Sequence, residues 1–352
     1  MSALNGHTQH FQSDQSGMAQ KKTIPVCLIT TLYNEEQSLR PFLESLNAMT
    51  VLPAQMVIVD GGSTDGSLAI LESFKETIAD TVSMKIIVDA TCSTKYSRSP
   101  IAKGRNVAIQ NSDFDIIAAT DAGCIVSNVW LEEITKPLLQ NEQILMVGGW
   151  YQPLATSYFE RCQALIVVPP VSTVDPKTFL PSSRSIAFRK ELWKTVGGYP
   201  ELTYTAEDTL FDLKIRQVTQ AIIFNEKAVV FWRMRPNLFV FIRMNYRYGF
   251  GEGVCRCSTR NIISTAAKLA FGVMLIVVST LYPLVGTALL VLYAWLLPFN
   301  KNIRDAFRVS HLLKYPAIAI LKIVMNNVYI AGYLHGRFTA EQPQFIKLQD
   351  SH

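Results

Sequence analysis

The sequence predicts an α/β fold with a mostly parallel sheet, followed by hydrophobic helices toward the C-terminus. Short apolar runs alternate with amphipathic stretches over residues 24–124, which is typical of strands joined by crossover helices. The apolar runs are continuous, as expected of strands that are buried on both faces of a sheet. Residues 269–297 form a stretch of 29 residues without a charge, longer than the roughly 20 that a membrane-spanning helix needs.

The first half of the chain supplies these elements in alternation. The expected strands are residues 24–30, 56–60, 84–90 and 114–124, and the expected helices are residues 38–49, 67–78 and 101–110. Ligands bind beyond the carboxyl ends of strands in such sheets. Asp60 and Asp121 each end an apolar run and meet a glycine turn, so both are candidate site residues. Asp89 is interpreted as a solvated turn residue or a helix cap.

The second half is mixed. Strands are expected at residues 144–152 and 182–190, helices at residues 155–168 and 205–218, and a hairpin or a pair of short strands at residues 221–232. The helix at 155–168 is expected to lie over the site. Glu207 and Asp208 head the later helix, where carboxylates are favourable in any case because the N-terminal end is positive.

Composition excludes several classes of protein. No histidine lies between residues 11 and 310, so neither a Ser-His-Asp or Cys-His catalytic unit nor a Cys/His zinc site is expected there. Any metal would sit on oxygen ligands, which suits Mg²⁺ or Mn²⁺. The six cysteines form no C-x-x-C pair, which favours a reduced, cytosolic setting. The net charge of +5 is too mild to indicate nucleic-acid binding.

The flanks of the uncharged stretch indicate its topology. Basic residues cluster on both sides, with Arg243, Arg247, Arg256, Arg260 and Lys268 before it and Lys301, Arg304, Arg308 and Lys314 after it. Because positive charge marks the cytoplasmic side, a helical hairpin turning near Pro283 is favoured over a single kinked span. A re-entrant hairpin and two short spans both stay open, with a buried core hairpin as the alternative. Residues 315–336 are expected to form a helix lying in the membrane interface.

Five motifs occur in a set order. T-x-Y-N-E-E follows the first strand, D-x-G-S-T-D follows the second, G-R-N lies in a helix, T-D-A-G follows the fourth strand, and a GGYPE turn precedes an E-D pair. Together they resemble the inverting nucleotide-sugar glycosyltransferases of family 2, which have the GT-A fold, over about residues 24–253. The membrane segment makes the chain similar to the membrane-associated bacterial members that build polysaccharides and exopolysaccharides.

The resemblance implies roles for several residues. Thr31, Tyr33 and Asp60 would line the pocket for the nucleotide's base and ribose, with Asp60 accepting a hydrogen bond from the base. Arg105 would lie near the base and the diphosphate. The family holds a divalent cation, Mg²⁺ or Mn²⁺, with D-x-D. Here the second Asp is replaced by Gly123, which leaves Asp121, the diphosphate and water as the expected metal ligands and weakens the metal site.

Inversion requires a general base that deprotonates the acceptor hydroxyl as it attacks the anomeric carbon. The resemblance implies Asp208 for this role, with Glu207 as its neighbour. Arg233, Arg235 and Arg247 either meet the diphosphate or the acceptor, or are plain juxtamembrane charge. Processive members carry Q-x-x-R-W, and the string M-N-Y-R-Y here argues against a processive synthase.

The predicted organisation is a disordered tail (1–22, without a signal peptide), a GT-A catalytic domain (23–255), a membrane-associated helical region (256–340) and a second tail (341–352). The predicted function is transfer of one sugar from a nucleotide-diphospho-sugar, UDP-linked by expectation, to a lipid-linked or polysaccharide acceptor. It would act on the cytoplasmic face of the inner membrane, without nucleic acid. The alternatives are a non-catalytic subunit that keeps the fold and a sugar nucleotidyltransferase.

Overall fold

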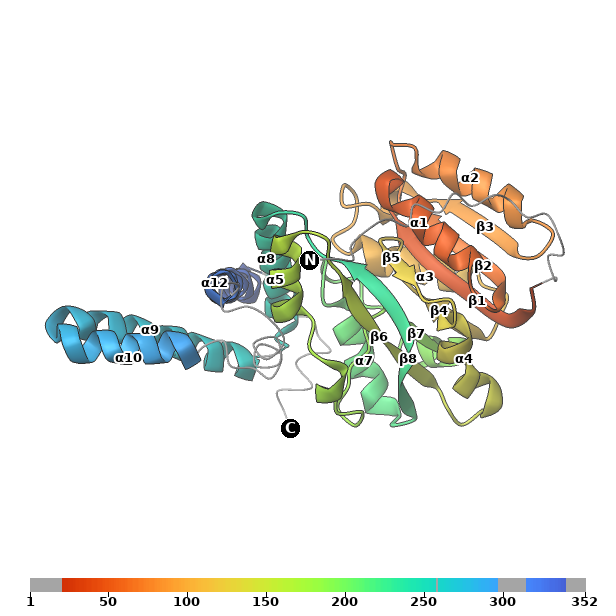
Figure 1. Ribbon diagram of the computed structural model, residues 1–352. Coiled ribbons are helices and arrows are strands. Elements are labelled where there is room, and N and C mark those ends of the chain that lie inside the picture. Colours follow the sequence, from red (N-terminus) through yellow and green to blue (C-terminus); the bar gives the residue numbers. More distant parts are fainter. Residues whose placement is uncertain (1–20, 258, 297–314, 340–352) are drawn as a thin grey trace, which may run out of the picture.

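The computed structural model describes residues 21–257, 259–296 and 315–339, and Figure 1 shows how their elements are arranged. The two predicted tails therefore lie outside the described residues, apart from residues 21 and 22. An eight-stranded sheet forms the centre of the α/β part, with the strand order β3-β2-β1-β4-β7-β6-β8-β5. The strands are β1 (Thr23–Leu32), β2 (Leu52–Asp60), β3 (Ser83–Val88), β4 (Ile116–Ala119), β5 (Cys124–Val126), β6 (Met146–Leu154), β7 (Ile186–Arg189) and β8 (Ile222–Arg233).

The first four strands of the order are parallel, as the alternating pattern predicts. β1 pairs in parallel with both β2 and β4, and β2 pairs in parallel with β3. Leu32 lies opposite Asp60 in this register, and Ile29 lies opposite Ala119. The carboxyl ends of β1, β2 and β4 therefore meet at one edge of the sheet.

The other half of the sheet is mixed, and three expectations need correction. β7 is antiparallel to both β4 and β6. The hairpin or pair of short strands expected at residues 221–232 is instead one strand, β8. The register between β6 and β8 shifts between Gly148 and Trp150, and the Asn225 side-chain amide donates to Glu133 at this irregularity. The run 114–124 is divided into β4 and the start of β5. β7 is shorter than the predicted strand because residues 182–185 lie in a turn, in which the Ser185 N–H donates to the Ser182 carbonyl at 2.9 Å, and because a helix begins at Lys190.

Helices cover both faces of the sheet. The helices of this part are α1 (Glu36–Asn47), α2 (Ser67–Ile78), α3 (Pro100–Gln110), α4 (Trp130–Gln140), α5 (Tyr158–Val167), α6 (Lys190–Thr195) and α7 (Glu207–Val218), with short 3₁₀ turns η1 (Ala90–Cys92) and η2 (Val171–Thr173). Successive residues of β1 point to opposite faces, as a strand requires. Leu28 belongs to the core with α1, α2, α4 and α5, and Ile29 to the core with α3, α6 and α7.

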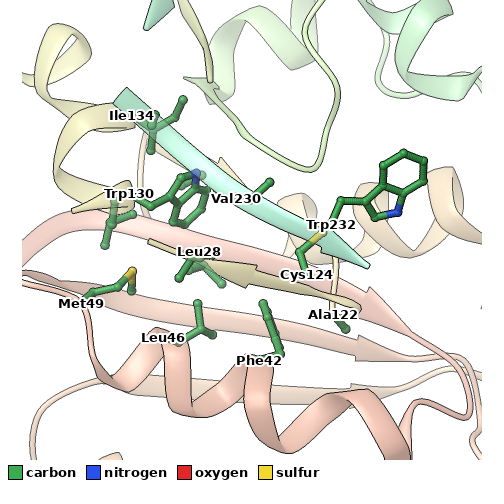
Figure 2. Packing of buried hydrophobic residues seen from close by; sticks show 14 of the residues in the cluster. Leu28, Phe42, Leu46, Met49, Ala122, Cys124, Trp130, Ile134, Val230 and Trp232 are labelled. Carbon is green, nitrogen blue, oxygen red and sulfur yellow. The ribbon is translucent and has the colours of Figure 1, made fainter. Parts of the chain in front are cut away.

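The core that contains Leu28 explains the position of α1 and α4. The apolar face of α1 is fully buried at Leu39, Phe42, Leu43 and Leu46. Figure 2 shows Phe42 and Leu46 beside Leu28, with Trp130 of α4 nearby. The Trp130 indole N–H donates to the Ser185 hydroxyl at 2.9 Å, so the ring is buried without leaving its polar group unpaired.

In the part of the chain that the structure describes, the sheet is followed by α8 (Leu238–Cys255), α9 (Thr259–Leu281), α10 (Pro283–Leu296) and α12 (Tyr315–Thr339). The chain reverses at Pro283, and α9 and α10 lie side by side, extending away from the sheet (Figure 1). A Cβ on Gly286 would come within 2.3 Å of the Ser279 Cα, so glycine permits this close contact. The reversal of the chain predicted around Pro283 is thus confirmed.

Helices α8 and α12 pack together through two glycine pairs. A Cβ on Gly249 or Gly253 would lie 2.1 Å from a backbone oxygen of α12, and a Cβ on Gly332 or Gly336 would lie 2.2 Å from a backbone oxygen of α8. Both helices carry their glycines four residues apart, which places them on one face and lets the backbones touch. No larger residue fits this contact without separating the helices.

We predict that Gly253→Leu destabilises the full chain by about 1–3 kcal/mol because the side chain overpacks a backbone contact. Thermal unfolding in detergent micelles measures the effect. Ala331→Leu on the exposed side of α12 is the matched control and should leave the unfolding temperature near that of the parent. Equal stability of the two variants would contradict the close packing of α8 and α12.

Candidate active site

One large cavity lies at the edge where the carboxyl ends of the parallel strands meet. It has a volume of about 850 Å³. Its wall is formed by the end of β1, the turn after β4, the segment before β7, the start of α7, the end of β8 and one side of α8, and α12 contributes Met325 and Tyr329. Strand ends of a parallel sheet are where ligands bind in such folds, so the cavity is the candidate active site.

Arg105 of α3 joins the two sides of this cavity. Its Nη2 donates to Asp121 Oδ1 at 2.7 Å, and its Nη1 donates to Glu207 Oε1 at 2.9 Å. The side chain is 4% exposed. Burial disfavours the charged guanidinium, but Asp121 and Glu207 outweigh that effect and raise the pKa of Arg105 above its ordinary value. One cation thus holds together the turn after β4 and the first turn of α7.

Arg184, just before β7, holds the other oxygen of Asp121. Its Nε lies 3.5 Å from Asp121 Oδ2, and its guanidinium lies 4.4 Å from the centre of the Trp232 ring. Nη1 donates to the Ser182 hydroxyl at 3.0 Å, and Nη2 donates to the Tyr248 hydroxyl at 3.2 Å. Burial opposes ionisation of Asp121, yet Arg105 and Arg184 keep its pKa below the usual value.

Glu207 and Asp208 begin α7 and differ in their surroundings. Ala206, the residue before them, adopts a left-handed conformation with φ of 69°, which is uncommon for a residue other than glycine and is found where a site constrains the backbone. Glu207 is buried against Arg105, and burial together with Asp208 raises the pKa of Glu207 to about 7. Asp208 also lines the cavity. Its Oδ2 accepts from the Ser182 hydroxyl at 3.4 Å, and its Oδ1 accepts from the Thr209 N–H at 2.9 Å.

Two of the three residues expected to line the nucleotide pocket lie at the cavity wall, and the third does not. Thr31 and Tyr33 line the cavity. A Cβ on Gly104 would come within 2.2 Å of the Thr31 hydroxyl oxygen, so α3 lies directly against the end of β1. Asp60 lies at the same sheet edge but is buried and is not among the residues that line the cavity. Its Oδ1 accepts from the Ser63 N–H at 2.7 Å, and its Oδ2 is buried without a hydrogen-bond partner among the described residues.

The three arginines singled out from the sequence all line the cavity, and Arg243 joins them. Arg233, Arg235 and Arg247 are not part of an ion pair within the described residues. Arg247 lies with its guanidinium 4.6 Å from the centre of the Tyr204 ring, and Arg235 lies 5.6 Å from the Trp232 ring centre. Positive charge therefore concentrates on the wall formed by β8 and α8.

A divalent cation does not fit the donor set at Asp121. Both of its oxygens already face guanidinium groups, and Gly123 offers no carboxylate. A Cβ on Gly123 would meet nothing within 4 Å, so the place of the second family Asp is open space. Within residues 21–257, 259–296 and 315–339, no three His, Cys, Asp or Glu side chains form a possible metal site. The expectation that Asp121 holds a metal does not agree with this arrangement.

Two residues of the site region were not identified from the sequence. Arg184 stands in the string S-S-R-S before a short strand, where neither periodicity nor a motif distinguishes it. Asp212 lies one helical turn after Asp208, and this spacing was the available signal. Asp212 is fully buried, and neither carboxyl oxygen has a hydrogen-bond partner among the described residues. Burial, with Asp208 nearby, raises the pKa of Asp212 well above its ordinary value.

The parallel half-sheet, its mixed extension and the cavity at the strand ends define a GT-A fold. A solved structure with this fold is the mannosyltransferase PcManGT of Pyrobaculum calidifontis in complex with GDP-Man and Mn²⁺. It is 18% identical, with a TM-score of 0.54, and the match covers 90% of this chain and 88% of that one. Because that relative binds Mn²⁺ with its donor, the fold is compatible with a divalent metal.

Residues 27–195 match the family model for glycosyl transferase family 2, which supports a glycosyltransferase of this family. The chain is 21% identical to glycosyltransferase GlyA of Streptococcus pneumoniae over 60% of its own length, but spans only 30% of GlyA. It is also 21% identical to glycosyltransferase AglE of Haloferax volcanii, over 71% of this chain and 82% of AglE.

The buried carboxyls predict how stability depends on pH. An acid whose pKa is raised by folding binds its proton more tightly in the folded state, so its contribution is greatest below the unfolded pKa and is lost as pH rises through the folded pKa. We predict that Asp212→Asn, which removes the ionisable group, reduces the fall in unfolding temperature between pH 5 and pH 8. Asp80→Asn at an exposed position is the control. An unchanged pH profile in Asp212→Asn would mean that Asp212 does not titrate in this way.

Proposed function

We propose that this protein is an inverting glycosyltransferase that moves one sugar from a nucleotide-diphospho-sugar to an acceptor hydroxyl, with Asp208 as the general base. The observation that supports this proposal most is the contrast between two adjacent carboxylates. Glu207 is buried and paired with Arg105, whereas Asp208 faces the cavity and makes no ion pair with a described residue. A base must be able to accept a proton from the acceptor, and Asp208 satisfies this condition.

The donor would lie with its nucleotide toward β1 and its diphosphate toward the arginines. Tyr33 at the end of β1 is exposed and lines the cavity, so its ring is available to stack on a base. Asp60 has a buried carboxyl oxygen in need of a donor, which agrees with a hydrogen bond from the base after a small movement of the adjacent loop. We propose UDP or GDP as the nucleotide, the latter because PcManGT binds GDP-Man.

The acceptor would be lipid-linked or a membrane-proximal polysaccharide. Two helices, residues Ile262–Leu281 and Ala317–Thr339, are long and apolar enough to cross a membrane, and the second contributes Tyr329 to the cavity wall. Its partner α8 carries Arg243, Arg247 and Glu252, whose charges are costly inside a bilayer. We therefore propose that the α9–α10 hairpin inserts into the inner membrane, that α12 lies at its interface, and that the cavity faces the cytoplasm.

Asp208→Asn should reduce transfer by about 10²–10⁴-fold, the range expected for loss of a general base. Donor binding should stay near the parent value because the proposed nucleotide contacts lie on β1 and β2. Turnover with a radiolabelled nucleotide-sugar and calorimetric titration of the nucleoside diphosphate measure the two quantities separately.

Ser182→Ala is the graded control for this variant. It removes the hydroxyl that donates to Asp208 and should lower turnover by less than Asp208→Asn does. Near-normal turnover in Asp208→Asn would remove Asp208 from the mechanism.

The membrane proposal predicts that the chain stays in the membrane fraction after carbonate washing. Reporter fusions at Gln20 and His352 should both indicate the cytoplasmic side, because a hairpin returns the chain to the side from which it entered. Opposite sides for the two reporters would contradict the hairpin with an interfacial α12.

A further inference from the structure

We propose that this chain neutralises the donor diphosphate with arginine guanidinium groups, led by Arg184, in place of a divalent cation. The inference rests on the proposed glycosyltransferase function and concerns how its leaving group is stabilised. It begins from Asp121, whose carboxylate is held on one oxygen by Arg105 and on the other by Arg184. A guanidinium thus occupies the flank of Asp121 that a cation would need.

Arg184 has the free hydrogen-bond donors that this role requires. A guanidinium carries five N–H donors in a fixed planar arrangement. Three of them are directed to Asp121, Ser182 and Tyr248. One N–H on each terminal nitrogen is left without a partner among the described residues, so two charged donors remain for phosphate oxygens.

The surrounding contacts fix the orientation of Arg184. Its side chain is 19% exposed, and the guanidinium lies 4.4 Å from the Trp232 ring centre and 5.8 Å from that of Tyr151. Cation–π contacts of this kind hold a guanidinium in one plane while leaving its edge available. Arg184 is therefore preorganised at the cavity wall, which lowers the cost of binding an anion.

Further arginines can share the charge of the diphosphate. Arg233, Arg235, Arg243 and Arg247 line the same cavity, and the described part of the chain places no carboxylate within ion-pair distance of any of them. Arg235 directs its Nε to the Met244 sulfur at 3.0 Å, a weak acceptor that an anionic oxygen would readily replace. The positive charge on this wall is thus available to a ligand and is not neutralised internally.

The reaction balances without a metal ion. The acceptor oxygen forms a bond to the anomeric carbon as the bond from that carbon to the diphosphate oxygen breaks. The bonding electron pair stays on the leaving diphosphate, where Arg184 and its neighbours stabilise the developing charge. The proton of the acceptor hydroxyl passes to Asp208. The products are the glycosylated acceptor, the nucleoside diphosphate and the protonated Asp208 side chain.

Calorimetric titration of the full chain in detergent micelles tests the proposal, with UDP and GDP each used as the probe. The dissociation constant for the nucleotide that binds should agree within about twofold between buffer with EDTA and buffer with Mn²⁺, since the main charge contacts are arginines. Arg184→Gln should weaken binding about 10–100-fold in both buffers, as expected for the loss of charge-assisted hydrogen bonds. Arg161→Gln on the exposed part of α5 is the matched control and should bind like the parent.

Two further variants separate the possible roles of Arg184. Ser182→Ala removes the hydroxyl that joins Arg184 to Asp208. If Arg184 contacts the diphosphate directly, this variant should bind the nucleotide like the parent. Gly123→Asp combined with Arg184→Gln rebuilds a D-x-D string in open space and should convert binding to a form that needs Mn²⁺. Thermal unfolding of each variant confirms that it is folded.

Binding by the parent chain that fell at least tenfold in EDTA and returned with Mn²⁺ would overturn the arginine proposal while leaving the glycosyltransferase function intact. Equal dissociation constants for the nucleotide in Arg184→Gln and Arg161→Gln would also overturn it. Absence of binding to UDP and GDP in both buffers, with no sugar transfer, would overturn the proposed function itself together with this inference.

Discussion

The buried guanidinium of Arg105 is the contact on which the rest of the site depends. It reaches from α3 to the turn after β4 and to the first turn of α7, and it is paired with a carboxylate at each of them. A charge in such surroundings is tolerated only when it is paired and hydrogen-bonded. The bridge therefore fixes the distance between the side of the cavity proposed for the donor and the side proposed for the acceptor. It also makes the two adjacent carboxylates different. Glu207 is paired with Arg105, whereas Asp208 makes no ion pair with a described residue and lines the cavity.

The same cavity is physically joined to the apolar helices. The wall opposite the sheet is α8, and α8 is packed backbone to backbone on α12 through four glycines. Tyr329 of α12 lines the cavity, so a helix long and apolar enough for a membrane is part of the site. This continuity supports an acceptor that approaches from the membrane surface. Under the proposed function, the arginines of α8 would face both the anionic donor and the anionic headgroups of a bilayer, and the same charges suit both.

Sequence periodicity was sufficient to predict the elements whose structure is determined by burial alone. Helix α2 begins and ends at the predicted residues 67 and 78. The strand-end rule identified Asp121, and the family resemblance implied Glu207 and Asp208; all three line the cavity. Prediction from the sequence failed where specific side-chain contacts, and not the hydrophobic pattern, determine the structure. Asn225 bonds to α4 at an irregularity within a single strand, and the sequence there resembles a turn. Arg184 was missed because a cation before a short strand has no periodic signal, and its role depends on Trp232 and Tyr248, which are distant in sequence.

A double-mutant cycle between Arg105 and Glu207 tests the central claim most directly. Equilibrium unfolding of Arg105→Met should show a loss of about 3–5 kcal/mol because the buried carboxylate of Glu207 is left unpaired. Combining it with Glu207→Gln should recover part of that loss, giving a coupling energy of about 1–3 kcal/mol. Additive effects of the two substitutions would contradict the account, since Arg105 would then not be the bridge that holds the two sides of the cavity together.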